Sequence, residues 1–99
     1  MGNLLRQAQA MQREMDKARA EVSEARMEGT SPGGAVRVEV DGDGMVLAVN
    51  ISDGAELSNR EALQKQLLEA LRDGLGRAHS FRNERLSKVT GGLNLPGLF

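Results

Sequence analysis

Basic side chains near the end of the chain are the residues whose type and spacing best fit a binding chemistry. They are Arg77, Arg82, Arg85 and Lys88, and only Glu84 opposes them over this stretch. On a helix, residues three apart share a face, as Arg82 does with Arg85 and Arg85 does with Lys88. Four cations along about 17 Å of helix match the spacing of several duplex phosphates. The pattern favours phosphate binding, and its alternative is an ordinary solvated helix face.

Three cations near the start of the chain could add to this surface as secondary contacts: Arg6, Arg13 and Lys17. Dimerisation would double the whole set. The only aromatic residues are Phe81 and Phe99, so stacking on the bases of a single strand is disfavoured. If the ligand is a nucleic acid, the backbone of double-stranded DNA therefore fits these cations better than a single strand does.

Catalytic chemistry has no comparable support. His79 is the sole histidine and cysteine is absent, so a zinc site is not expected and His79 is interpreted as a polar surface residue. The segment Asp41-Gly42-Asp43-Gly44 lacks the remaining ligands of a calcium loop. Gly33-Gly34 is not followed by the Gly-Lys-Ser/Thr of a phosphate-binding loop. We expect no enzyme, no metal, no cofactor and no small-molecule substrate.

Length and charge predict one soluble domain spanning residues 1–99, with a formal net charge of −1. Residues 29–58 carry one basic and five acidic side chains, whereas residues 59–99 carry seven basic and four acidic ones. Because electrostatic fields act within a Debye length of about 8 Å, a local basic surface can bind a polyanion despite the acidic total. Without cysteine or a long apolar run, we expect a cytoplasmic protein with no membrane contact.

Residues 1–28 predict a long helix with a narrow apolar stripe, and Asn3 fits its N-cap. Intervals of four and three residues alternate along the stripe, which is a heptad pattern. Its members are Leu4, Ala8, Met11, Met15, Ala18, Val22 and Ala25. The stripe packs either on the core of its own chain or on a second subunit. Because the heptad pattern runs unbroken over three repeats, a contribution from a second subunit is favoured. We therefore expect this stripe to form an interface with another helix, either within the chain or in a dimer.

Residues 29–52 predict a sheet, because the hydrophobic period changes to two. Val36, Val38 and Val40 alternate with polar residues, and Asp41-Gly42-Asp43-Gly44 favours a hairpin turn. The next strand is expected to present its large apolar side chains on one side: Met45, Leu47, Val49 and Ile51. Strands with one dry face need helices to cover it, so the fold class is α+β in two layers.

Residues 58–89 predict a second long helix. Ser58 and Glu61 fit a capping box. Apolar residues follow at helical spacing: Leu63, Leu67, Leu71, Leu75 and Ala78. Gly74 and Gly76 inside a helix cost about 1 kcal/mol each relative to Ala, so a close approach of another element is the expected reason for them.

Residues 90–99 are not expected to be helical and form a tail that is either disordered or docked. Its apolar side chains are Leu93, Leu95, Leu98 and Phe99. If they bind a protein, the chain is instead an interaction adaptor whose helical arms bind a replication or recombination partner, and DNA affinity is incidental.

Three segments in order resemble the YbaB/EbfC family of bacterial nucleoid-associated proteins. Residues 5–15 resemble the opening helix of that family, and residues 89–97, Val-Thr-Gly-Gly-Leu-Asn-Leu-Pro-Gly, resemble its C-terminal signature. Between them, residues 34–38 and the hairpin stand in the corresponding places. The resemblance covers essentially the whole chain.

The resemblance implies an α-β-β-β-α fold with an antiparallel three-stranded sheet, two long helices and a tweezers-like homodimer. It places an additional strand around Met27 to Ser31, where periodicity alone indicates only a helix stop and a turn. It also implies a nucleoid-associated protein that binds duplex DNA and alters its conformation. The implied roles are nucleoid organisation, gene regulation and DNA protection.

Overall fold

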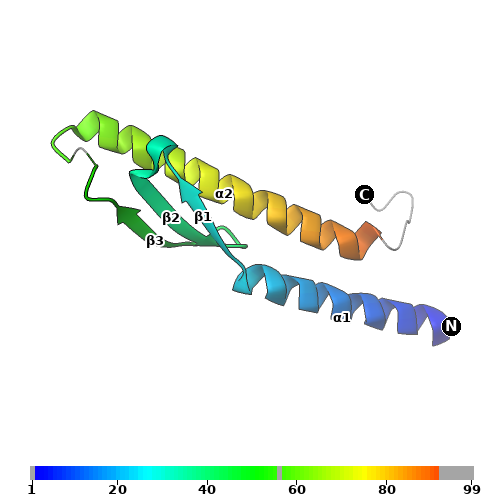
Figure 1. The fold of residues 1–99 in the computed structure, drawn as a ribbon. Helices are drawn as coiled ribbons and strands as arrows, with labels where there is room; N and C mark the ends of the chain where they lie inside the picture. The colour runs from blue at the N-terminus through cyan, green and yellow to red at the C-terminus, as the bar shows by residue number, and fades with distance from the viewer. Residues whose placement is uncertain (1, 56, 92–99) are drawn as a thin grey trace.

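The computed structural model describes residues 2–55 and 57–91 (Figure 1). Its elements, in chain order, are α1 (Gly2–Glu24), β1 (Arg26–Thr30), the 3-10 turn η1 (Pro32–Gly34), β2 (Val36–Asp41), β3 (Val46–Ile51) and α2 (Arg60–Gly91). The strands form one antiparallel sheet in the order β1-β2-β3. The expected α+β fold with two long helices and three strands is confirmed.

The core lies between α2 and the face of β1 and β2. Alternation buries Val36, Val38 and Val40 of β2 on this face, where Ala70 and Ala78 of α2 pack against them. Leu63, Leu67 and Leu71 are half-buried around this cluster. The small side chains on α2 bring the helix close to the sheet, which makes the core thin.

Two glycines set the distance between α2 and the sheet. A Cβ at Gly29 of β1 would collide with the backbone of Ala70 and Gly74, and a Cβ at Gly74 would lie 3.0 Å from Val38 Cγ2. The close approach expected for Gly74 is therefore present. A Cβ at Gly76 would have no neighbouring atom within 4 Å, so packing does not explain that glycine.

The first helix packs on the second half of α2, and the two run antiparallel (Figure 1). Its base is held by the β2–β3 turn, where Gly42 donates a backbone hydrogen bond to the carbonyl of Val22 (3.0 Å) and Ser23 Oγ donates to Asp43 Oδ2 (2.7 Å). Its N-terminal end extends past the end of α2 (Figure 1). The result is an arm that is anchored at one end.

The apolar stripe of α1 has an intrachain partner along part of its length. Ala18 and Val22 are buried and Met11 and Met15 are half-buried, whereas Leu4 and Ala8 are exposed. α2 of the same chain covers the C-terminal part of the stripe, as the intrachain alternative predicts, and a contribution from a second subunit stays a prediction.

Several boundaries differ from the expected ones. The helix expected over residues 1–28 ends at Glu24, because β1 begins at Arg26 and pairs with β2. The strand implied by the family resemblance is present. Asn3 lies inside α1 as its second residue.

The second helix begins at Arg60 and continues to Gly91. It is capped by Asn59, whose Oδ1 accepts a hydrogen bond from the N–H of Ala62 (3.1 Å), and not by the expected box of Ser58 and Glu61. Residues 92–99, which make up most of the expected tail, lie outside the described residues.

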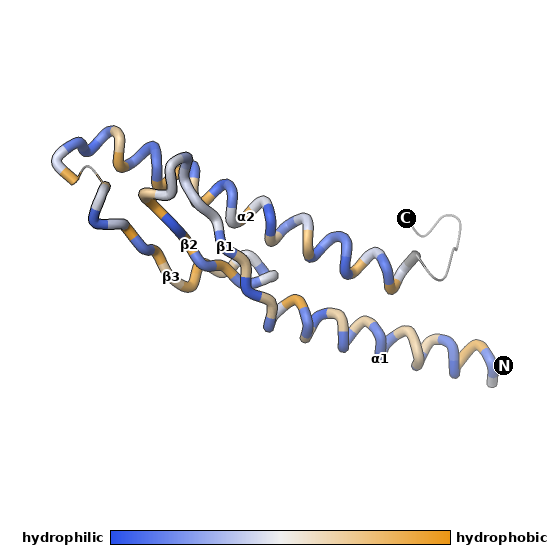
Figure 2. The backbone as a smooth tube through the Cα atoms, viewed as in Figure 1, coloured by the Kyte–Doolittle hydropathy of each residue, from blue (hydrophilic) through white to orange (hydrophobic). Residues whose placement is uncertain are grey.

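The third strand is the edge that α2 leaves uncovered. Val49 and Ile51 pair with Val38 and Val36, so they lie on the same side of the sheet as the core valines. They nevertheless remain 47% and 44% exposed, because α2 packs mainly on β1 and β2. The expected burial of the apolar side of this strand is wrong for the single chain, and Figure 2 shows hydrophobic positions along β3.

Candidate nucleic-acid interface

Three of the four cations expected near the end of α2 lie beside carboxylates. Arg77 Nε is 3.1 Å from Asp73 Oδ1, and Lys88 Nζ is 3.9 Å from Glu84 Oε1. Arg85 pairs with Glu21 of α1. Arg82 forms no ion pair with the residues that the structure describes. The expected basic surface is therefore partly neutralised within the chain.

Arg85 connects the two helices. Its Nε donates to Glu21 Oε2, and its side chain is only 24% exposed. This hydrogen bond lowers the pKa of Glu21 and raises the pKa of Arg85. The guanidinium holds α1 against α2, and this contact between residues 64 positions apart could not be read from the local charge pattern.

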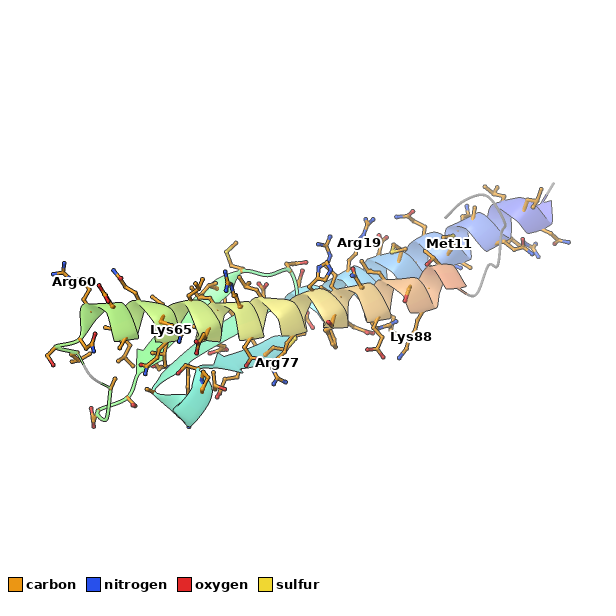
Figure 3. All side chains as sticks on the ribbon, turned by 90° about the horizontal axis from the view of Figure 1, so that it is seen from above. Met11, Arg19, Arg60, Lys65, Arg77 and Lys88 are labelled. Atoms are coloured by element: carbon orange, nitrogen blue, oxygen red, sulfur yellow. The ribbon has the colours of Figure 1, made fainter. Side chains whose placement is uncertain are left out.

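The remaining cations of this group lie on different flanks of α2. Arg77 lines an open groove of about 750 Å³ next to β1, together with Met27 and Phe81. Lys88 follows Arg77 by eleven residues, about three turns, and projects from the same side of the helix (Figure 3). Arg82 instead lines a hollow beside the β2–β3 turn. The structure does not bring the four cations onto one surface.

The cations of α1 form a more coherent stripe. Arg6, Arg13 and Lys17 follow at intervals of seven and four residues, so they share one face over about 17 Å. All three are exposed, and none forms an ion pair with a described residue. Ala18 and Val22 pack on the opposite side of α1. This face is therefore free to contact an extended anion.

Further exposed cations escaped the sequence analysis. Lys65 and Arg72 are two turns apart on the outer side of α2, and Arg60 begins this helix. Arg19 projects from α1 (Figure 3). None of the four has an ion-pair partner among residues 2–55 and 57–91. The seven-residue interval between Lys65 and Arg72 is a signal that could have identified those two.

The open face of the sheet is a poor surface for a polyanion. Arg26 Nε lies 3.8 Å from Glu39 Oε1, and Arg37 Nε lies 3.9 Å from Glu28 Oε1. These pairs cross between β1 and β2 and balance one another in charge. Cations available for phosphate contacts are thus found on the helices.

Asp73 fixes α2 to the edge of β1. Its Oδ2 accepts a hydrogen bond from the backbone N–H of Thr30 (3.0 Å), and its Oδ1 accepts one from Arg77 (3.1 Å). The hydrogen bond from Thr30 is the main cause of the lowered pKa of Asp73, and Arg77 contributes as well. Arg77 therefore has a structural role besides any contact with a ligand.

Other chemistry is not assembled in the described part of the chain. No three His, Asp or Glu side chains within residues 2–55 and 57–91 gather in a way that could hold a metal ion. His79 is exposed and hydrogen-bonded to Asn83 (3.0 Å). Neither described helix has an apolar stretch sufficient to cross a bilayer.

The chain is similar to known proteins over nearly its whole length. The family model described as the YbaB/EbfC DNA-binding family matches residues 1–93. A nucleoid-associated protein of Alkaliphilus metalliredigens is 34% identical over 100 residues, covering 100% of this chain and 88% of that protein. A second, from Clostridium novyi, is 37% identical with the same coverage.

A solved structure shares the fold. The crystal structure of an uncharacterized protein from Helicobacter pylori matches with a TM-score of 0.75 at 28% sequence identity. The match covers 91% of this chain and 92% of that chain.

Proposed function

Because the chain belongs to the YbaB/EbfC DNA-binding family, we propose that it binds duplex DNA through phosphate contacts and acts in the nucleoid. The observation that carries this proposal is the unpaired stripe of Arg6, Arg13 and Lys17 on the exposed face of α1. A line of cations contacts phosphates without reading base edges, so binding tolerates many sequences. The family is described by DNA binding and not by a catalysed reaction.

Cations of α2 extend this surface. Arg82, Lys65 and Arg72 are exposed, and none pairs with a carboxylate of the described chain. Contacts by Arg77, Arg85 and Lys88 stay a prediction, and they would require these side chains to leave or share their present carboxylate partners. We therefore assign the primary contacts to α1.

We further propose a homodimer. The uncovered side of β3 supports it, because an exposed edge strand with large apolar residues favours pairing with another chain. A second copy would cover Val49 and Ile51 and would present two arms to one duplex. Two arms that engage successive phosphate groups would favour a DNA shape that fits both. A change of DNA conformation, and with it roles in nucleoid organisation, gene regulation and DNA protection, follows from this proposal.

Salt dependence of DNA binding tests the stripe. Each phosphate contact that is lost reduces the magnitude of the slope of log affinity against log salt by about 0.9. We expect the variant Arg6→Ala/Arg13→Ala to lower that magnitude by about 1.8 for each protomer engaged. Fluorescence anisotropy with a labelled duplex at several salt concentrations measures it.

A matched control removes the same charge elsewhere. Arg26→Ala/Arg37→Ala takes two cations from the sheet, where both are paired with glutamates. This control should leave the slope close to that of the unaltered protein. Equal slopes for all three proteins would reject the assignment to α1, and a chain that ignores duplex even at low salt would reject DNA binding itself.

The adaptor hypothesis stays a prediction. Its expected patch, Leu93, Leu95, Leu98 and Phe99, lies outside the described residues.

A further inference from the structure

Gly76 has no packing role in the part of the chain that the structure describes. It lies in the middle of α2, where glycine is unfavourable because its backbone loses more freedom on folding than that of alanine. Gly74 is explained, since a Cβ there would meet Val38 and Gly29, but a Cβ at Gly76 would meet no atom within 4 Å. A residue that breaks a local preference without a gain in packing indicates a functional reason.

An open groove beside β1 is the surface that Gly76 leaves accessible. Gly76 lines this groove of about 750 Å³, together with other residues of α2 and Met27 of β1. Arg72 lies one helical turn before Gly76 and Ser80 lies one turn after it, so the three residues share one face of the helix. Because Gly76 has no side chain, a group from outside the chain can approach the backbone of α2 between these two donors.

Two arginines supply hydrogen-bond donors to the groove. Arg72 is exposed and forms no ion pair with residues 2–55 and 57–91. Arg77 binds Asp73 through Nε, and its side chain is 63% exposed, so its terminal nitrogens can donate to a further group. Ser80 adds an exposed hydroxyl. Guanidinium and hydroxyl donors of this kind are those that bind phosphate oxygens.

The two carboxylates that line the groove are balanced within the chain. Asp73 accepts hydrogen bonds from the N–H of Thr30 and from Arg77. Glu84 Oε1 lies 3.9 Å from Lys88 Nζ. With these two pairs compensated, the charge of Arg72 remains, and charge complementarity favours an anion as the occupant.

We propose that the groove at Gly76 binds a phosphate group of the DNA backbone, with Arg72, Arg77 and Ser80 donating to its oxygens. Met27 and Phe81 form the apolar part of the lining, which suits the C–H surface of the adjoining sugar. This inference rests on the proposed DNA binding and adds a contact on α2, separate from the cations of α1. Gly76 is the residue that admits the phosphate to the helix surface.

Filling the groove tests the role of Gly76. Gly76→Leu places a side chain in the groove and removes an unfavourable helix residue, so we expect Tm to be no lower than in the unaltered protein. The Kd for duplex DNA should nevertheless rise at least about fivefold, because hydrogen bonds to a charged group are lost. Gln64→Leu is the matched control, because Gln64 is exposed on α2 about three turns away and does not line the groove.

The two readouts separate a binding role from a structural one. An unchanged Kd for Gly76→Leu would overturn the proposal, as would a Kd that rises equally in Gln64→Leu. A lower Tm for Gly76→Leu would give this glycine a structural role and would overturn the functional reason for it.

Removing one donor provides a test that leaves Gly76 in place. Arg72→Ala should reduce the magnitude of the slope of log affinity against log salt by about 0.9 for each protomer engaged. Arg37→Ala is the control, because Arg37 is paired with Glu28 on the open face of the sheet. Equal slopes for the two variants would contradict a phosphate contact by Arg72.

A single engineered thiol reports directly on contact in the groove, because the chain has no cysteine of its own. We expect duplex DNA to slow the reaction of Gly76→Cys with a maleimide severalfold, and to leave the reaction of Asn50→Cys on the open sheet face unchanged. Equal rates with and without duplex, in a protein that binds duplex, would overturn the groove and leave the proposed function intact. Protection by polyglutamate but not by duplex would also overturn it, and would assign the groove to an acidic protein partner.

Discussion

At the scale of single residues, charged side chains of this protein divide into those that hold the fold and those left for a ligand. Arg85 and Asp73 belong to the first group, since each ties α2 to a distant segment through Glu21 or Thr30. We propose that Arg6, Arg13 and Lys17 belong to the second, since they are exposed and form no ion pair with the residues that the structure describes. Residue type alone does not separate the two groups, because the partner carboxylate is remote in sequence.

The carboxylate of Asp73 should make the free energy of unfolding depend on pH. Because the folded state lowers the pKa of this carboxyl, its contribution is complete above the ordinary carboxyl pKa of about 4 and is lost as the pH falls through the lowered value. Asp73→Asn should therefore lower Tm at pH 7 and approach the unaltered protein at low pH. Thermal unfolding followed by circular dichroism between pH 2.5 and 7, roughly the titration range of a carboxyl, measures this.

Asp53→Asn is the control, because Asp53 is exposed and has no hydrogen-bond partner among the described side chains. A difference in Tm that stays constant with pH for Asp73→Asn would contradict the role given to this carboxylate.

At the scale of elements, the contact between α2 and β1 depends on the absence of side chains. Gly29 and Gly74 let two backbones meet, and the methyl groups of Ala70 and Ala78 fill what space remains. This geometry places α2 over β1 and β2 and leaves β3 outside. The position of the helix therefore determines which strand keeps an exposed apolar side.

A pair of glycine substitutions tests this contact. Gly29→Ala would drive a methyl group into the backbone of α2, and overpacking of this kind costs about 1–3 kcal/mol or more. Gly76→Ala meets open space and gains helix propensity, so it should stabilise the protein by up to about 1 kcal/mol. Urea unfolding of both variants gives the free energies, and a neutral Gly29→Ala would show that the backbones do not meet so closely.

At the scale of the whole molecule, the chain is an elongated body of 67 × 24 × 15 Å with a sheet near one end and two helices that extend from it. One surface of the body is apolar along β3, and another is cationic along α1. The proposed homodimer joins the apolar surfaces and leaves the cationic ones free. In this proposal, association and DNA binding use different parts of the molecule.

Val49→Lys tests the proposed dimer surface, because it puts a charge where a second copy would pack. We expect this variant to run as a single subunit by light scattering at micromolar concentration, and to bind duplex more weakly because half of the cations are lost. Asn50→Lys, on the other side of β3, is the matched control and should remain dimeric. An unaltered protein that is itself a single subunit would reject the homodimer.

Much of this architecture can be predicted from local patterns. A heptad stripe, an alternating run of valines and a leucine period indicate the helices and the β2 strand, because each reflects the repeat of its own element. β1 is different, because Arg26–Thr30 has no clear alternation of apolar and polar residues. The strand forms because it can pair with the edge of β2 and because Gly29 has no side chain to block the close approach of α2. Only the family resemblance indicated this strand.

By itself, the sequence determined that the chain has two long helices, a hairpin and more cations on the helices than its net charge suggests. Tertiary structure decided which of those cations are engaged, since Glu21 and Arg85 become neighbours only when α1 folds back on α2. It also decided that β3 stays uncovered, because the sheet is wider than the single helix that crosses it. Both outcomes depend on contacts between segments that are distant in sequence, and the spacing of neighbouring residues in the sequence does not predict such contacts.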